Sequence, residues 1–203
     1  MERQEFKRQL DELGRIILEG IAYFTVWHGL VAEDEDTAKA LNRYRGLFLP
    51  AQIGLKWMTL LQFSKVFDRH SKAISLSNLL TVAKQNPGEL IPHATKENLR
   101  DIEQKIENSK DLLTRLKRVR DKRIAHHDAI IAGDTHLLYG ETRKLVEEVK
   151  SMYNSLTIYY DRSSTIYDFF VREAERHTSQ VVDIIRKEKD RAIRRIKKLD
   201  TAT

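Results

Sequence analysis

Apolar side chains near the N-terminus recur at steps of three and four residues, the spacing that places them on one face of an α-helix. This first stripe consists of Phe6, Leu10, Leu13, Ile17, Ile21 and Phe24. We therefore predict a long helix from Glu2 to Ala32. The acidic run Glu33–Asp36 ends it, and acidic side chains favour the N-terminus of a following helix. That second helix is predicted over residues 37–47.

Proline and glycine divide the middle of the chain. Pro50 is predicted to lie in the first turn of a new helix, where a missing N–H is tolerated, and the helix continues to Asp68. The inner face of this helix is predicted to carry Ile53, Trp57, Leu60, Leu61, Ser64 and Phe67. A loop then leads to a short helix capped by Ser75 or Ser77, which Asn86-Pro87-Gly88 stops.

A helix capped by Thr95 is predicted to run to about residues 125–128. Its inner face is expected to carry Leu99, Ile102, Ile106, Leu113 and Leu116, followed by Val119 or Arg120. A turn at Ala132-Gly133 and a cap at Asp134 then lead into a helix over residues 135–160. The apolar stripe of that helix is Leu138, Leu145, Val149, Met152 and Leu156.

The last helix is predicted to begin at Ser163 or Ser164 and to extend to Leu199, with only a thin apolar seam. No alternating apolar and polar pattern of useful strand length occurs in the sequence. The predicted fold class is therefore all-α, with long N- and C-terminal helices. We expect a helical bundle over residues 1–175 and a basic amphipathic helical extension over residues 176–203.

The composition agrees with a helical protein and indicates the compartment in which it works. Of 203 residues, 41% are hydrophobic and 33% charged, with only 8 glycines and 3 prolines to interrupt helices. The sequence contains no cysteine, which excludes disulfides and thiolate metal sites and suits a reducing compartment. The apolar runs are far too short for a bilayer span, and the charged N-terminus has no signal-peptide core. We expect a cytoplasmic protein that does not associate with a membrane.

The positive charge of the chain is concentrated in two segments. Residues 186–198 carry a net charge of +6 and residues 114–127 carry +5. Because the whole chain carries +6, the remainder has a net charge of −5. Two basic segments on an acidic body suit an anionic partner, although a solvated helix face is the plainer interpretation of any single charge run.

Residues 115–128, with the sequence RLKRVRDKRIAHHD, combine cations with two adjacent imidazoles. In a regular helix Arg120 and His127 share a face, whereas His126 lies about 120° away from Arg120. An imidazole can take the proton of a ribose 2′-hydroxyl or give one to the leaving 5′-oxygen, and a guanidinium can bind the phosphate. Asp121 or Asp128 could orient an imidazole. Two alternatives remain open on these residues, a structural or plain anion-binding helix end and a metal site at His-His-Asp.

The segment resembles the motif of the HEPN superfamily, an arginine followed by four to six variable residues and a histidine. RDKRIAHHD and the earlier FDRHSKAISLSNLL are similar to the abortive-infection U-type branch, and the resemblance covers most of residues 37–160. It implies a compact helical bundle that dimerises to form a metal-independent endoribonuclease of the toxin or defence kind. By the same resemblance Arg120 binds phosphate, Asp121 positions and His126 is the acid and base. His127 fits a six-residue spacer, so both imidazoles remain candidates.

Further phosphate-binding candidates are Arg118, Lys122, Arg123 and Arg69. We expect no cofactor and no metal. The expected partners are RNA and a second copy of the chain, with an antitoxin protein as a further candidate. The alternative function is a non-catalytic helical module that binds RNA, a nucleotide or a protein partner.

Overall fold

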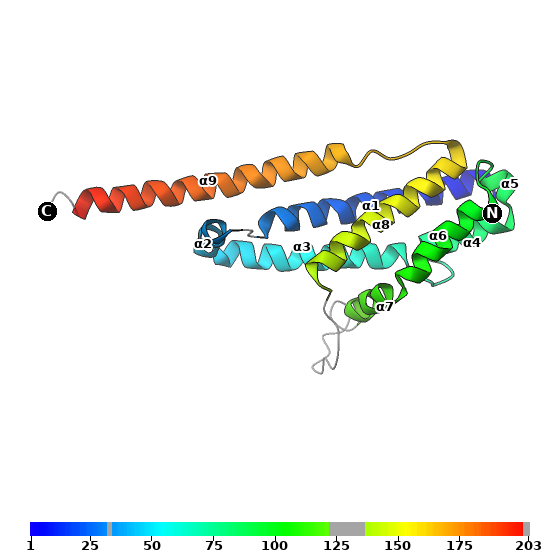
Figure 1. Cartoon of the computed structure of the whole chain (residues 1–203), viewed down its shortest axis with the longest axis horizontal. Helices are drawn as coiled ribbons and strands as arrows, with labels where there is room; N and C mark the ends of the chain where they lie inside the picture. Colours follow the sequence, from blue (N-terminus) through cyan, green and yellow to red (C-terminus); the bar gives the residue numbers. More distant parts are fainter. Residues whose placement is uncertain (32–33, 122–136, 201–203) are drawn as a thin grey trace. The chain divides into compact units, whose positions relative to one another are not determined.

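The computed structural model describes residues 1–31, 34–121 and 137–200, without the side chains of residue 168 and residues 189–200. Within these ranges every regular element is a helix, so the predicted all-α class is confirmed (Figure 1). The helices are α1 (Arg3–Leu30), α2 (Glu35–Arg43), α3 (Arg45–Val66), α4 (Leu76–Gln85), α5 (Pro87–Leu90), α6 (Lys96–Asn108), α7 (Lys110–Val119), α8 (Tyr139–Asp161) and α9 (Asp168–Asp200). No single described helix is long and apolar enough to cross a membrane, although the bent pair α1 and α2 passes that test on length and composition alone.

The chain forms two compact units. The first comprises Met1–Ile21 and Trp57–Ile166, and the second comprises Ala22–Lys56 and Tyr167–Thr203. The predicted boundary between residues 175 and 176 falls inside α9 and stays a prediction.

The core of the first unit is built on the predicted stripe of α1. Its residues Phe6, Leu10, Leu13, Ile17 and Ile21 are at most 1% exposed, which confirms the prediction. From α8, the predicted Leu145, Val149, Met152 and Leu156 are fully buried as well. Tyr153 of α8 donates a hydrogen bond to the carbonyl oxygen of Leu10 at 3.2 Å, and Gly14 leaves the space that its ring occupies. A buried hydroxyl with a backbone acceptor thus fixes the position of α8 along α1.

The second unit has a small apolar core. Its buried cluster consists of Leu30, Leu41, Phe48 and Val182, with Val26, Leu55 and Ile185 packed against it. Asp34 caps α2 by accepting a hydrogen bond from the backbone N–H of Thr37 at 2.7 Å. The last helix was predicted to carry a thin apolar seam that includes Val181, Val182 and Ile185. This is partly confirmed, because Val182 is buried and Ile185 packs against the cluster, whereas Val181 is 45% exposed.

The predicted helix break at Pro50 is wrong. The chain breaks at Tyr44 instead, and Pro50 lies inside α3. Proline removes the hydrogen bond to the carbonyl four residues earlier, here that of Gly46, which is exposed and has open space beside it. Water can therefore satisfy that carbonyl. The predicted inner face is confirmed in part, because Leu60 and Ser64 are buried whereas Ile53 is 47% exposed. Phe63, which was not predicted to lie on that face, is fully buried.

The helix predicted from Thr95 through the basic segment is broken at Ser109. Thr95 forms the expected cap, with Asn98 completing a capping box. The hydroxyl of Ser109 lies 3.0 Å from the carbonyl oxygen of Lys105 and 2.5 Å from a carboxylate oxygen of Glu148 in α8. A serine bonded back to its own helix bends it, and α7 leaves the direction of α6 at this residue (Figure 1).

The cap predictions differ in their outcome. Ser75 caps α4 as expected, through a hydrogen bond from the N–H of Asn78 at 3.3 Å. The helix expected from residue 135 begins at Tyr139, and Leu138 just before it is 67% exposed rather than part of the stripe. Arg162 ends α8 in a left-handed conformation with φ of 63°, and the last helix starts at Asp168, later than predicted. The predicted helix end at 125–128 and the turn and cap at 132–134 lie outside the described residues.

Candidate functional site

Helix α7 carries the described part of the basic motif and is anchored on two sides. Leu116 and Val119 are at most 1% exposed and face the core. Arg115 makes two hydrogen bonds with Glu141 in the first turn of α8, one of them 3.0 Å long. The hydrogen bond from Arg115 holds the pKa of Glu141 below its ordinary value. Apolar burial and this two-point ion pair together fix the rotation of α7 about its axis.

At the end of α7 the guanidinium of Arg120 is held by two carboxylates. Its Nε donates to Asp121 at 2.7 Å and its Nη1 donates to Asp68 at 3.0 Å. The hydrogen bond with Asp121, together with the negative charges of both aspartates, raises the pKa of Arg120 above its ordinary value. Asp68 also accepts a hydrogen bond from the backbone N–H of His70 at 2.9 Å. One carboxylate thus connects the end of α7 to the loop after α3.

Arg120 follows the last residue of α7, and its backbone N–H bonds the carbonyl oxygens of Leu116 and Lys117. The side chain of Arg120 is 24% exposed. Within the described part of the chain, its Nη2 has no hydrogen-bond partner. A fixed guanidinium with one nitrogen still available can bind an anion without first having to be ordered.

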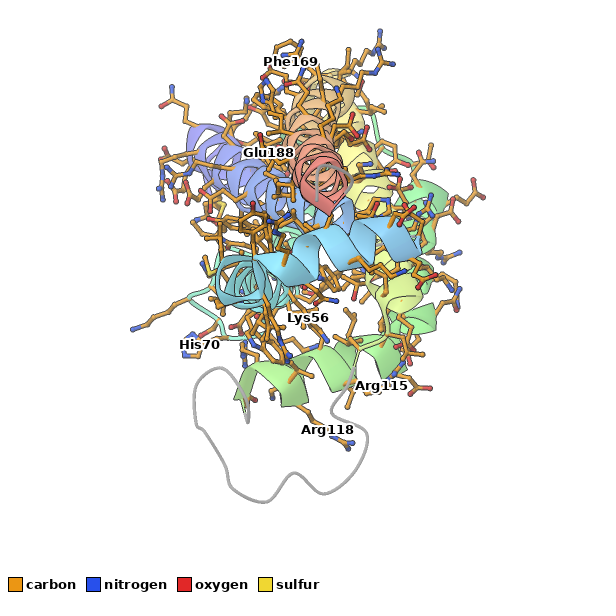
Figure 2. The ribbon with its side chains drawn as sticks, turned by 90° about the vertical axis from the view of Figure 1, so that its left-hand side faces the viewer. Lys56, His70, Arg115, Arg118, Phe169 and Glu188 are labelled. Atoms are coloured by element: carbon orange, nitrogen blue, oxygen red, sulfur yellow. The ribbon has the colours of Figure 1, made fainter. Side chains whose placement is uncertain are left out.

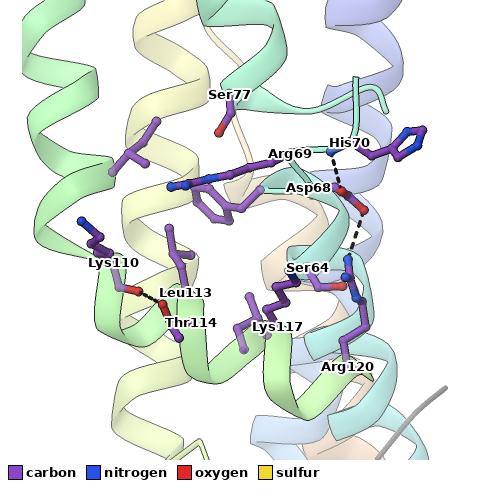
Figure 3. Close-up of a pocket in the computed structure, with 13 residues that line it drawn as sticks. Ser64, Asp68, Arg69, His70, Ser77, Lys110, Leu113, Thr114, Lys117 and Arg120 are labelled. Atoms are coloured by element: carbon purple, nitrogen blue, oxygen red, sulfur yellow. Dashed lines mark hydrogen bonds and ion pairs between the residues drawn. The ribbon is translucent and has the colours of Figure 1, made fainter. Parts of the chain in front are cut away.

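Beside Arg120 lies a pocket of about 630 Å³, formed by the loop after α3 together with α3, α4, α6 and α7. Its lining residues are Ser64, Phe67, Asp68, Arg69, His70, Ser77, Ile106, Lys110, Leu113, Thr114, Leu116, Lys117 and Arg120. Figure 3 shows the side chain of Arg69 extended across this pocket, whereas the ring of His70 points away from it. The volume is in the range of sites for small ligands.

The charges around the pocket favour an anion. Among the described residues of the lining, Asp68 contributes the one carboxylate, against the cations of Arg69, Lys110, Lys117 and Arg120. Lys110 forms an ion pair with Glu107 at 2.6 Å. Among the described side chains, neither Arg69 nor Lys117 forms an ion pair, so both can pair with a ligand. A net positive, partly enclosed surface attracts phosphate more strongly than a solvated helix face does.

Some of the predicted site residues lie at the pocket, one lies outside it, and others are not among the described residues. Arg69 and Arg120 line the same pocket, and Asp121 is hydrogen-bonded to Arg120. Arg118 is exposed and projects from α7 in Figure 2, outside the pocket lining. The predicted site residues Lys122, Arg123, His126 and His127 lie outside the described residues. The meeting of Arg120 with an imidazole therefore stays a prediction.

Two residues with clear roles in this geometry were missed at the level of the sequence. Asp68 holds Arg120 from 52 residues away, and Lys117 lines the pocket from the preceding turn of α7. Asp68 lies in the FDRH stretch that carried part of the family resemblance, and that was the available signal. In the described ranges, no three His, Cys, Asp or Glu side chains are grouped in a way that could hold a metal ion.

A comparison with protein-family models supplies the class of the protein. A HEPN-type family model matches residues 3–181, which is most of the chain, so this all-helical protein is a HEPN domain of the abortive-infection type. The matching family is AbiU2, and the chain belongs to it. Searches of the curated proteins and of the solved structures found no significant match.

Proposed function

We propose that the protein is a cytoplasmic, metal-independent endoribonuclease of the toxin or abortive-infection type that acts as a homodimer. The observation that carries the proposal is Arg120, oriented by two carboxylates at the edge of a pocket lined with cations. Membership of the AbiU2 family supports the same function. In this reaction Arg120 binds the scissile phosphate, Asp121 is the residue that positions Arg120, and His126 or His127 transfers the proton.

The chemistry needs only these groups. The ribose 2′-oxygen attacks phosphorus while an imidazole removes its proton. The bond from phosphorus to the 5′-oxygen breaks, and the leaving oxygen receives a proton. The products are a 2′,3′-cyclic phosphate and a 5′-hydroxyl. The guanidinium stabilises the charge that grows on the phosphate oxygens in the transition state.

The test is incubation of the protein with mixed RNA in EDTA, followed by analysis of the new ends. Wild type should produce 2′,3′-cyclic phosphates, and Arg120→Ala should lose cleavage while keeping its fold by circular dichroism. Arg143→Ala is the matched control, because Arg143 is exposed on α8 and does not line the pocket. Equal cleavage by the Arg120 and Arg143 variants, or cleavage that EDTA abolishes, would refute the proposal.

The composite nature of the site has its own test. His126→Ala and His127→Ala are compared first, to find which imidazole acts. The inactive histidine variant is then mixed with Arg120→Ala under conditions that exchange subunits. In a site shared between two protomers, the mixture should recover part of the activity that each variant lacks. A monomer in sedimentation analysis, or no recovery after proven exchange, would exclude the shared site.

A second function is favoured by one observation, the pairing of Arg120 with two carboxylates that already neutralise its charge. On that ground the alternative function is that of a non-catalytic module that binds RNA, a nucleotide or a protein partner such as an antitoxin. RNA would then bind in a salt-sensitive manner and remain intact after long incubation. Expression separates the two functions as well, since an active toxin depresses growth and His126→Ala or His127→Ala relieves it.

A further inference from the structure

The pocket beside Arg120 is amphiphilic. Four of its lining side chains are apolar, namely Phe67, Ile106, Leu113 and Leu116. Ser77 and Thr114 add hydroxyl groups, and Arg69 and Lys117 add cations without an ion pair among the described side chains. A ligand that matches this lining has an apolar part and an adjacent anion. Simple phosphate would leave the apolar part of the pocket unused.

We propose that this pocket holds one unpaired nucleotide of the RNA next to the scissile phosphate. The base lies against Phe67 and Leu113, and a neighbouring phosphate lies between Arg69 and Lys117. This inference rests on the proposed function, because it assigns the strand that Arg120 engages. A paired base cannot enter such a pocket without leaving its stack, so the site selects single-stranded or locally unpaired RNA.

A free nucleotide has the same chemistry as one nucleotide of a strand. The strand is favoured because cations continue beyond the pocket along α7, where exposed Arg118 follows Lys117 directly. Free nucleotide would gain nothing from a cation outside the pocket. The two sources predict different competition, which the binding assay measures.

Binding is measured with strands that cannot be cleaved, because their 2′-oxygens are methylated. Three probes with the same number of phosphates per strand are compared: a mixed-sequence single strand, the same strand in a duplex, and a strand whose sugars carry no bases. Burial of one base predicts that the single strand binds about tenfold more tightly than either of the others. Equal affinity for all three probes would overturn the inference, because binding would then depend on phosphates alone.

Thr114→Phe fills the pocket without changing its charge. Thr114 is exposed on α7, and its hydroxyl bonds the carbonyl oxygen of Lys110 at 2.8 Å. Thr81→Phe is the matched control, because Thr81 is exposed on α4, bonds the carbonyl oxygen of Ser77 at 2.9 Å and lies outside the pocket. The tenfold preference should fall to near parity in Thr114→Phe and persist in Thr81→Phe. A preference that survives in Thr114→Phe would place the base elsewhere.

The phosphate position and the source of the ligand are tested with the same probes. Arg69→Ala and Lys117→Ala should each weaken binding of the single strand several-fold, and Arg143→Ala should change it little. Free nucleoside monophosphates should compete only at concentrations far above that of the strand, and competition at equal concentration would exclude RNA as the occupant. Because no probe can be cleaved, these outcomes are independent of the cleavage assay. A protein that shows the pocket-dependent preference but never cuts RNA would refute the nuclease proposal alone.

Discussion

The packing of α8 against α1 leads to a quantitative prediction at Gly14. A Cβ added there would lie 2.2 Å from Oη and 2.8 Å from Cζ of Tyr153, both far inside contact distance. Tyr153 as a whole residue is 5% exposed, so its ring has little room to move. Overpacking of this kind costs about 1–3 kcal/mol. Loss of the hydrogen bond to Leu10 destabilises the fold by about another 1 kcal/mol, while the higher helix propensity of alanine stabilises it by about 1 kcal/mol.

Gly14→Ala should therefore lower the free energy of unfolding by about 1–3 kcal/mol. In a Tyr153→Phe background the closest atom is absent, so the same change should cost at least about 1 kcal/mol less. Urea unfolding followed by circular dichroism measures both values. Gly54→Ala is the matched control, because it also adds a Cβ inside a helix but meets open space, and it should stabilise slightly. A Gly14→Ala protein as stable as wild type, or an equal cost in both backgrounds, would refute the packing argument.

Three further predictions address the ionisable groups. Burial, together with the charges of Asp11 and Asp161, raises the pKa of Tyr153 from 10.0 to about 12. The contribution of this protonated hydroxyl to the free energy of unfolding is therefore fully present below pH 10 and is lost as the pH rises through 12. Wild type should lose up to about 3 kcal/mol more than Tyr153→Phe across that interval in urea unfolding, and parallel curves would contradict this. Asp68→Asn removes the charge that orients Arg120 and should lower kcat about tenfold without raising KM in steady-state cleavage, whereas a rise in KM alone would argue against a positioning role. Arg115→Met removes the ion pair between α7 and α8 and should lower the free energy of unfolding by about 1–2 kcal/mol, against less than about 0.5 kcal/mol for Arg118→Met, and equal effects would show that the pair adds no stability.

Signals that act within one turn of helix could be read from the sequence. The stripe of α1 and the caps at Ser75 and Thr95 were predicted correctly, because periodic burial and side-chain caps depend on residues three or four positions apart. The errors at Pro50 and Ser109 have a different origin. In the first case the residue whose carbonyl loses its partner, Gly46, is exposed, and in the second Ser109 contacts Glu148 of another helix. Both also depend on the tertiary arrangement, through solvent exposure in the first case and a contact with another helix in the second.

The candidate site likewise combines contacts between sequence neighbours with contacts that only the fold creates. The motif identified Arg120 and its neighbour Asp121 because they are adjacent in the chain. The pairing of Arg120 with Asp68 needs α3 and α7 to converge, which no local pattern specifies. The resemblance of the FDRH stretch marked that segment without assigning a role to its aspartate. Nothing in the sequence favoured Lys117 over the other cations of the same helix. The structure distinguishes Lys117 from Arg118 because Lys117 lines the pocket and Arg118 does not.

Under the proposed function, the charges around Arg120 assign substrate binding and catalysis to different residues. With Asp68 and Asp121 the guanidinium forms a cluster of net charge −1, which by itself repels a phosphate. Arg69 and Lys117 reverse that sign at the pocket, so they supply the attraction that brings the anion to the site. The two carboxylates fix the direction of Arg120, and in the proposed reaction such a preorganised guanidinium stabilises the transition state more than the ground state. Loss of Arg69 or Lys117 should accordingly appear in KM, and loss of Arg120 in kcat.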